Sequence, residues 1–311
     1  MALRVLPLGL ALLGAACDTA ERVKNALRAD QGDPVWQGDS TLLATHPEVL
    51  FRVTRDSAGP RIVPLATMGS QGFRLLTLSD RGWRAFDLDY LHAGKPLTPY
   101  RDGRALPPVA TTRGMWEGAP LDTIRGCSIM LPGAAASIPA DVELFSSGAR
   151  PRPTPVAALS ASDLQAALDA IPMLIAPAAG ISPSLITRYQ RVVHVAQTGS
   201  GPRPTLVVEY NDPEVVADSV RPIGQRPRQL IVVLNQGVYG YRPTFTYTTL
   251  GNKLSPPRYR YLDHFDVDDD GTSELFFGLA IKGAPLYTIV LRYDTDAWRE
   301  LLRNERQRCH A

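Results

Sequence analysis

The amino-acid sequence predicts a mainly β protein with two antiparallel β-rich parts, of the sandwich or partial-propeller type, together with a short linking helix and a C-terminal helix. Short segments with alternating or continuous apolar side chains recur about every ten residues, as is typical of all-β sandwiches and barrels. Clusters of Gly, Pro, Asn and Asp separate them and supply the backbone conformations of turns. A run of alternating prolines favours an extended path and predicts the boundary between the two parts.

The composition is that of a globular protein. Of 311 residues, 44% are hydrophobic and 21% are charged, so each part can bury a core. The 33 basic and 31 acidic residues leave a net charge of +2, which is too weak to hold a polyanion by counterion release. We therefore expect no nucleic-acid partner.

Residues 1–16 have the order of a secretory signal, with a positive charge at Arg4, an apolar run, and small residues before Cys17. The run is well short of the roughly 20 residues that cross a hydrocarbon core, so it predicts a cleaved leader. Its end, Leu13-Gly14-Ala15-Ala16-Cys17, resembles the lipobox of bacterial lipoproteins. The resemblance implies that Cys17 is acylated, with chains such as palmitate, and becomes the mature amino terminus.

An ordinary secretory signal cut near Ala16 is the alternative. In either case the mature chain is expected to be exported. Acylation would anchor it to a bacterial membrane, with the ectodomain in the periplasm or outside the cell.

The N-terminal part spans residues 41–148 and follows a polar tether over residues 17–40. Four of its segments have the length and pattern of strands in a meander: residues 49–54, 61–66, 73–78 and 83–88. The stretch over residues 92–120 is rich in Pro, Gly and Arg and has little periodicity. We expect a long ordered loop there.

A Pro-rich linker over residues 149–158 precedes the C-terminal part, residues 159–311. Ser160, followed three positions later by Asp163, indicates the start of a helix. The apolar residues that follow lie on one helical face, and we expect Pro172 to end this short helix.

Seven segments of the C-terminal part have the pattern of strands: residues 191–197, 205–210, 229–235, 244–250, 259–265, 275–280 and 286–293. The tail over residues 296–308 places Trp298, Leu301 and Leu302 at helical spacing, with charged residues between them. This pattern predicts the C-terminal helix.

Cys127 and Cys309 are the only cysteines after Cys17, an even pair in an exported chain. A disulfide between them would tie the C-terminal tail to the first half of the chain. Two unpaired thiols are the alternative, and the sequence leaves both open.

An acidic segment late in the chain carries six carboxylates between Asp263 and Glu274. Such a cluster repels itself unless a cation gathers its oxygens, and Ca²⁺ suits it better than Mg²⁺ because Ca²⁺ takes six to eight oxygen ligands. Asp266, Asp268 and Asp270 alternate and can turn inward together, while Gly271 permits a sharp bend. A solvated acidic turn is the alternative.

The segment Asp266-Val267-Asp268-Asp269-Asp270-Gly271-Thr272-Ser273-Glu274-Leu275 resembles the DxDxDGxx(D/E) loop of the FG-GAP and VCBS repeat families, which bind Ca²⁺ between β-strands. The resemblance implies five ligands, namely the side chains of Asp266, Asp268, Asp270 and Glu274 and the backbone of Thr272. An EF-hand does not fit, because its bidentate glutamate would fall at Phe277. With protein groups in all these positions, we expect the ion to be structural.

The sequence contains no HExxH, GxSxG, P-loop or helix-opening GxGxxG motif. We therefore expect a protein that is not an enzyme and acts as a binding or structural component of the cell envelope, with an envelope protein or a glycan as partner. The rival expectation is an exported hydrolase built from distant residues, with His92, Asp263 and His264 as candidates. Four tyrosines predict either a ligand-binding face or cross-strand packing: Tyr239, Tyr241, Tyr259 and Tyr261.

Overall fold

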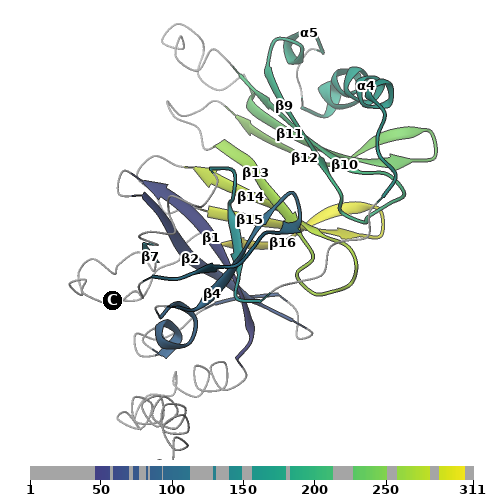
Figure 1. Ribbon diagram of the computed structural model, residues 1–311. Coiled ribbons are helices and arrows are strands. Elements are labelled where there is room, and N and C mark those ends of the chain that lie inside the picture. Colours follow the sequence, from purple (N-terminus) through teal and green to yellow (C-terminus); the bar gives the residue numbers. More distant parts are fainter. Residues whose placement is uncertain are drawn as a thin grey trace, which may run out of the picture.

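The computed structural model describes residues 46–56, 59–69, 73–76, 82, 85–92, 94–112, 129–130, 140–148, 156–179, 183–212, 227–250, 258–280 and 287–304. The leader, the tether and all three cysteines, Cys17, Cys127 and Cys309, lie outside these ranges, as do residues 149–155 of the linker. The described chain is mainly β and forms three antiparallel sheets, which confirms the predicted fold class (Figure 1). None of its helices is both long and apolar enough to cross a membrane.

The first sheet, here called the N-terminal sheet, has the strand order β3-β2-β1-β8-β4-β5, with β6 paired to β4 and β7 to β2. Its strands are β1 (Glu48–Asp56), β2 (Gly59–Met68), β3 (Arg74–Leu75), β4 (Pro96–Arg101), β5 (Arg104–Ala105), β6 (Val109–Ala110), β7 (Ile129–Met130) and β8 (Leu144–Ser146). The loop predicted over residues 92–120 thus contains three strands. Pro96 and Pro99 concealed β4, because prolines normally argue against a strand.

The strand predicted over residues 83–88 is wrong in its described part. Ala85 and Phe86 are helical and lead into η1 (Asp87–Leu91). Phe86 and Tyr90 stack with their ring centroids 4.7 Å apart, and Phe86 also contacts Phe51 of β1. The apolar side chains of this helical turn therefore cover the outer face of the N-terminal sheet.

The other two sheets are four-stranded meanders in which each strand pairs with the next along the chain. The β9–β12 sheet contains β9 (Gln190–Ala196), β10 (Thr205–Asn211), β11 (Pro227–Gly237) and β12 (Gly240–Leu250). The β13–β16 sheet contains β13 (Arg258–Phe265), β14 (Glu274–Ala280), β15 (Tyr287–Asp294) and β16 (Ala297–Asn304). All seven predicted strands of the C-terminal part are confirmed, and both sheets have the four-stranded form of propeller blades.

Helix α4 (Ala161–Ala179) begins where the sequence predicts, because the Ser160 hydroxyl accepts the N–H of Asp163 at 3.0 Å. It does not end at Pro172. Ile171 and Ile175, one turn apart, are buried against the β9–β12 sheet, and this packing outweighs the hydrogen bond that the proline removes. The short helix α5 (Pro183–Ile186) packs beside it.

The predicted C-terminal helix is wrong, because residues 297–304 form β16, paired to β15. The register shifts between Val290 and Leu291, which leaves an extra residue in β16 and brings Leu301 and Leu302 close together on one face. Trp298 packs on the opposite face. A bulged strand with apolar residues packed on both faces therefore carries them at helix-like spacing.

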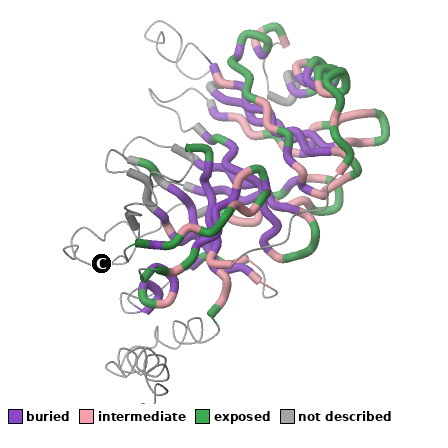
Figure 2. Tube along the Cα trace, in the orientation of Figure 1, coloured by how far each residue is buried: buried purple, intermediate pink, exposed green. Residues whose placement is uncertain are grey.

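Four hydrophobic clusters set the order of the layers. The β13–β16 sheet lies in the centre, with one face against the N-terminal sheet and the other against the β9–β12 sheet. The second face of the β9–β12 sheet is covered by α4 and α5. The buried residues concentrate between these layers (Figure 2). The cluster between the N-terminal sheet and the β13–β16 sheet joins residues 50–144 to residues 262–290. The two parts of the chain therefore share a core.

Side chains of the β9–β12 sheet protect the free edge of β13. The Gln229 amide accepts the N–H of Tyr259 at 2.8 Å and donates to its carbonyl at 2.5 Å, which imitates a strand pairing. The Glu209 carboxylate accepts the N–H of Tyr261 at 2.6 Å. An exposed edge would offer these backbone groups to other chains, so the contacts both join the sheets and close the edge.

Candidate metal centre

The loop that connects β13 to β14, residues 266–273, is here called the acidic loop, and local geometry fixes its course. Asp269 and Gly271 have positive φ angles of 61° and 86°, which fold the chain sharply back. The Asp266 carboxylate accepts the N–H of Gly271 at 2.9 Å, and the Asp270 carboxylate accepts the N–H of Thr272 at 2.7 Å. The loop is therefore held by its own aspartates.

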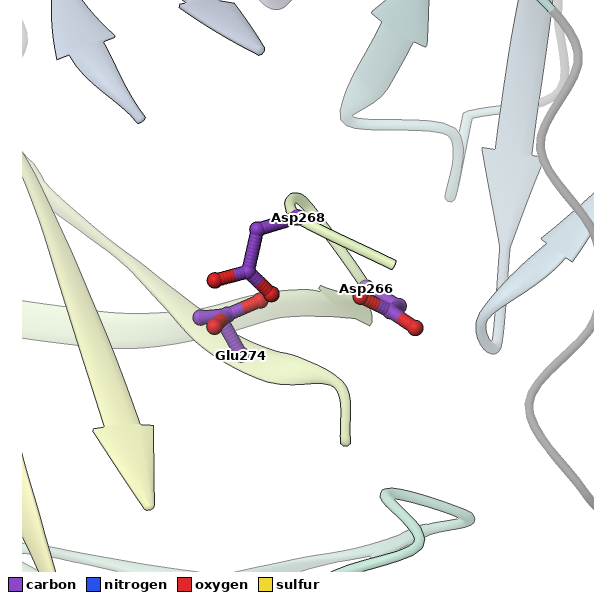
Figure 3. Close-up of side chains that lie close together, drawn as sticks. All are labelled: Asp266, Asp268 and Glu274. Atoms are coloured by element: carbon purple, nitrogen blue, oxygen red, sulfur yellow. The ribbon is translucent and has the colours of Figure 1, made fainter. Parts of the chain in front are cut away.

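Three of the predicted ligands converge. One oxygen each of Asp266, Asp268 and Glu274 can be chosen so that all lie within 4.8 Å of one another. Figure 3 shows Asp268 extending from the loop toward Glu274, with Asp266 beside them. Glu274 is only 1% exposed and Asp266 8%, so these carboxylates are held away from bulk water. A fully solvated turn would instead leave these two acids as exposed as Asp269 and Asp270 are.

The other two predicted ligands are placed differently. Asp270 is exposed and lies outside the converging group, with its carboxylate engaged by the N–H of Thr272. Thr272 is half-buried next to it. The structure thus brings together the first, second and last acids of the DxDxDGxx(D/E) motif.

Two oxygens of the converging group have no hydrogen-bond partner in the part of the chain that the structure describes. Within the described residues, Oδ1 of Asp266 and Oδ1 of Asp268 are buried and have no partner. An unsatisfied buried carboxylate oxygen is costly, and buried charges are normally paired or bound to a metal. These oxygens fit a hard divalent cation, because such ions bind carboxylate oxygen directly.

Arg292 of β15 is a member of the centre that the loop motif does not contain. Its Nε donates to Oε1 of Glu274 at 3.1 Å, and its Nη2 contacts Oδ2 of Asp268. Leu291, the residue before it, pairs with Leu275, so the strand register delivers the guanidinium beside the loop. The one signal in the sequence was a charged residue directly after the apolar run of β15.

Burial dominates the electrostatics of the centre. It raises the pKa of Glu274 to about 8, although N–H groups of Val267 and of Glu274 itself oppose the shift. It also raises the pKa of Asp266, and the neighbouring carboxylates of Asp269 and Asp270 add to the effect. The centre therefore favours additional positive charge, even with Arg292 in place.

The acidic loop also rests on the turn between β9 and β10. The N–H of Ser273 donates to the carbonyl of Thr198 at 2.7 Å. Gly199, with φ of +75°, approaches so closely that a Cβ there would lie 2.5 Å from the carbonyl oxygen of Gly271. An ion in the loop would thus stabilise a contact between two sheets.

Asp263 and His264 lie in the protein interior. In a regular strand, neighbouring side chains point to opposite faces. Here the strand register shifts between Tyr261 and Asp263, and Oδ1 of Asp263 lies 3.5 Å from Nδ1 of His264. The Asp263 carboxylate accepts the N–H groups of Gly103 and His264 at 2.9 and 2.8 Å. His264 Nε2 accepts the N–H of Gln197 at 3.2 Å, so Nδ1 carries the proton and donates to the Tyr261 hydroxyl at 2.7 Å. Asp263 therefore connects the β13–β16 sheet to the N-terminal sheet, and His264 connects it to the β9–β12 sheet.

His92, the third hydrolase candidate, is not brought to this pair. It is exposed at the end of η1, on the outer face of the N-terminal sheet, and its carbonyl accepts the hydroxyl of Thr111 at 2.6 Å. The three candidates therefore form no common site.

The four predicted tyrosines divide between core and surface. Tyr259 and Tyr261 are buried between the two four-stranded sheets, which is the packing alternative. Tyr239 and Tyr241 line a groove of about 310 Å³ between α4 and the β11–β12 hairpin, and Tyr239 is fully exposed. The groove also presents an ion pair at 3.6 Å between Asp163 and Arg203.

No protein-family model, curated protein or solved structure matches this chain. The likeness to FG-GAP and VCBS loops therefore stays confined to the ten residues that carry it.

Proposed function

We propose that this protein is an exported bacterial lipoprotein, anchored through Cys17, whose ectodomain binds a structural Ca²⁺ in the β13–β14 loop. It acts as a binding or structural component of the cell envelope. The leader pattern supports the anchor. The observation that carries the ion is a pair of buried oxygens of Asp266 and Asp268 that have no partner in the described part of the chain, beside the buried carboxylate of Glu274.

The position of the loop supports a structural role for the ion. Val267 packs in the core between the N-terminal and β13–β16 sheets, and Ser273 is bonded to the β9–β10 turn. A cation that fixes the loop thus stabilises contacts among all three sheets. Reaction chemistry would instead require an open coordination position next to a substrate cavity.

Calcium is expected to raise the midpoint of thermal unfolding of the full chain. Extracellular Ca²⁺ modules have dissociation constants of about 0.1–1 mM, so about 5 mM Ca²⁺ should stabilise the fold by about 1–2 kcal/mol. This corresponds to a rise of a few degrees over the protein in chelator. Scanning calorimetry of the detergent-solubilised protein measures it directly.

Two variants serve as controls for that experiment. Asp268→Ala removes a converging carboxylate and should abolish the response to Ca²⁺. Asp296→Ala removes an exposed acid of the β15–β16 turn and should leave the response intact. A wild-type midpoint that is equal in Ca²⁺ and in chelator would contradict the ion site.

The anchor has a separate test. In a bacterial host, the wild-type protein should fractionate with membranes and incorporate a palmitate analogue. Cys17→Ser should lose the label and leave the membrane fraction, because the acyl chains supply the membrane affinity. Retention of the variant on the membrane would disprove anchoring through this cysteine.

The groove beside α4 supports a binding role in preference to a hydrolase. Its lining combines the rings of Tyr239 and Tyr241 with the polar side chains of Asp163, Arg203 and Gln236. It contains none of the three hydrolase candidates. Aromatic rings beside polar groups of balanced charge suit a neutral polar ligand such as a glycan, or a polar protein segment.

A further inference from the structure

We infer that Arg292 is an internal counter-ion of the acidic loop, and that a divalent cation must displace its guanidinium from Asp268 in order to bind. The inference rests on the proposed calcium site and adds the residue that sets its affinity. Arg292 contacts two of the three converging carboxylates, Asp268 through Nη2 and Glu274 through Nε at 3.1 Å. It therefore competes for oxygens that the ion needs.

The charges of the centre support this competition. Asp266, Asp268 and Glu274 carry three negative charges when ionised, and Arg292 supplies one positive charge, so two remain to be balanced. A divalent cation balances them. However, the cation and the guanidinium then lie at the same carboxylates, where repulsion between like charges is strong because the site is largely buried.

The two contacts of Arg292 differ in how easily they can be broken. The Arg292 side chain is 34% exposed, so the guanidinium has a path to water, and the Asp268 side chain at 16% is more accessible than that of Glu274 at 1%. The structure therefore favours release of Asp268 first, while Nε can stay on Glu274. Oδ1 of Asp268 is already unpartnered among the described residues, so release of Oδ2 frees the whole carboxylate.

Competition lowers the apparent affinity for the cation by the free energy needed to move the guanidinium. Coupling between two binding events of this kind typically changes affinity by about 5- to 150-fold. Arg292→Gln removes the charge and retains a side chain that can donate to Glu274. We expect this variant to bind Ca²⁺ about tenfold more tightly than the wild type.

Calorimetric titration of CaCl₂ into the detergent-solubilised full chain tests the inference. Arg292→Lys keeps the competing charge and should bind within a few-fold of the wild type. Arg299→Gln is the matched control, because Arg299 lies directly opposite Arg292 on β16 but pairs with Asp294. Its affinity should be unchanged.

The outcomes separate this inference from the proposed function. Ca²⁺ binding that is equal or weaker in Arg292→Gln than in the wild type overturns the counter-ion role and leaves the calcium site standing. No binding to the wild type or to Arg292→Gln overturns both. Binding to Arg292→Gln alone supports the counter-ion role, with the arginine holding the site closed in the wild type.

A measurement on the wild type covers the case in which Arg292→Gln does not fold. In protein labelled with ¹⁵N-arginine, the Nε–H resonance of Arg292 is assigned by its loss in Arg292→Lys. Saturating Ca²⁺ should shift this resonance, because the guanidinium leaves Asp268. A resonance that stays unchanged while Ca²⁺ binds overturns the inference.

Discussion

Replacing Phe276 by alanine is expected to lower the free energy of unfolding by about 3–5 kcal/mol, the cost of removing a large aromatic side chain from a packed core. Phe276 is fully buried on the central sheet, in the cluster that joins this sheet to the N-terminal sheet. Its ring also meets Phe73 edge-on, with the centroids 6.4 Å apart. The loss therefore acts on the contact between the two parts of the chain.

Urea unfolding followed by tryptophan fluorescence and by far-ultraviolet circular dichroism measures this effect. Tyr239→Ala is the matched control, because it also truncates an aromatic side chain but at a fully exposed position, where we expect a change within about 0.5 kcal/mol. The shared core predicts one transition, shifted equally for both probes. Two separate transitions, with only one of them shifted by Phe276→Ala, would show that the two parts fold independently.

The pH dependence of stability is expected to change strongly when Asp263 is replaced by asparagine. Burial raises the pKa of Asp263 to about 7, with the carboxylates of Asp102 and Asp141 adding to the shift and the N–H groups of Gly103 and His264 opposing it. In the unfolded chain this group has its ordinary pKa near 3.9. Between the two values the unfolded state has lost the proton that the folded state still holds, so stability falls as pH rises from about 4 to 7.

This fall amounts to at most about 4 kcal/mol for a shift of about three pH units. Asparagine resembles the protonated carboxyl and can still accept the N–H groups of Gly103 and His264, so Asp263→Asn should match the wild type near pH 4 and exceed it near pH 8. Asp263→Ala leaves both N–H groups without their acceptor and should be about 2–5 kcal/mol less stable than the wild type near pH 4. This deficit should shrink as pH rises, because only the wild type loses stability through Asp263. Urea unfolding across this pH range gives the comparison, since all other titrating groups are common to wild type and variant. Parallel curves for wild type and Asp263→Asn would contradict the raised pKa.

The errors in the fold prediction occur where tertiary packing overrides the local sequence pattern. Local pattern identifies a strand well when one face is apolar, and all seven strands predicted in the C-terminal part are present. The pattern fails for β16, because its bulge and the apolar residues on its two faces give Trp298, Leu301 and Leu302 a helical spacing. The pattern also fails at Pro172, because packing of Ile171 and Ile175 keeps α4 helical beyond a residue that usually ends a helix.

The candidate metal centre, too, was predictable from the sequence only in part. The spacing of Asp266, Asp268 and Glu274 is visible in the sequence because all three lie in one loop, and this short segment brings them together. The burial of Asp266 and Glu274, the two oxygens that have no partner among the described residues, and the contact with Arg292 are not visible there. Arg292 comes from a neighbouring strand, and the register of β14 against β15 decides which residue reaches the loop.

The mainly β character of this chain and the position of an acidic turn with ordered spacing follow from its amino-acid pattern, because both depend on near neighbours in the chain. The burial of Asp266 and Glu274 among the sheets, the contacts by which Asp263 and His264 join those sheets, and the arginine that shares the carboxylates came to light only in the folded protein. These features depend on how distant segments pack, since burial and charge pairing are set by the layers that surround a residue.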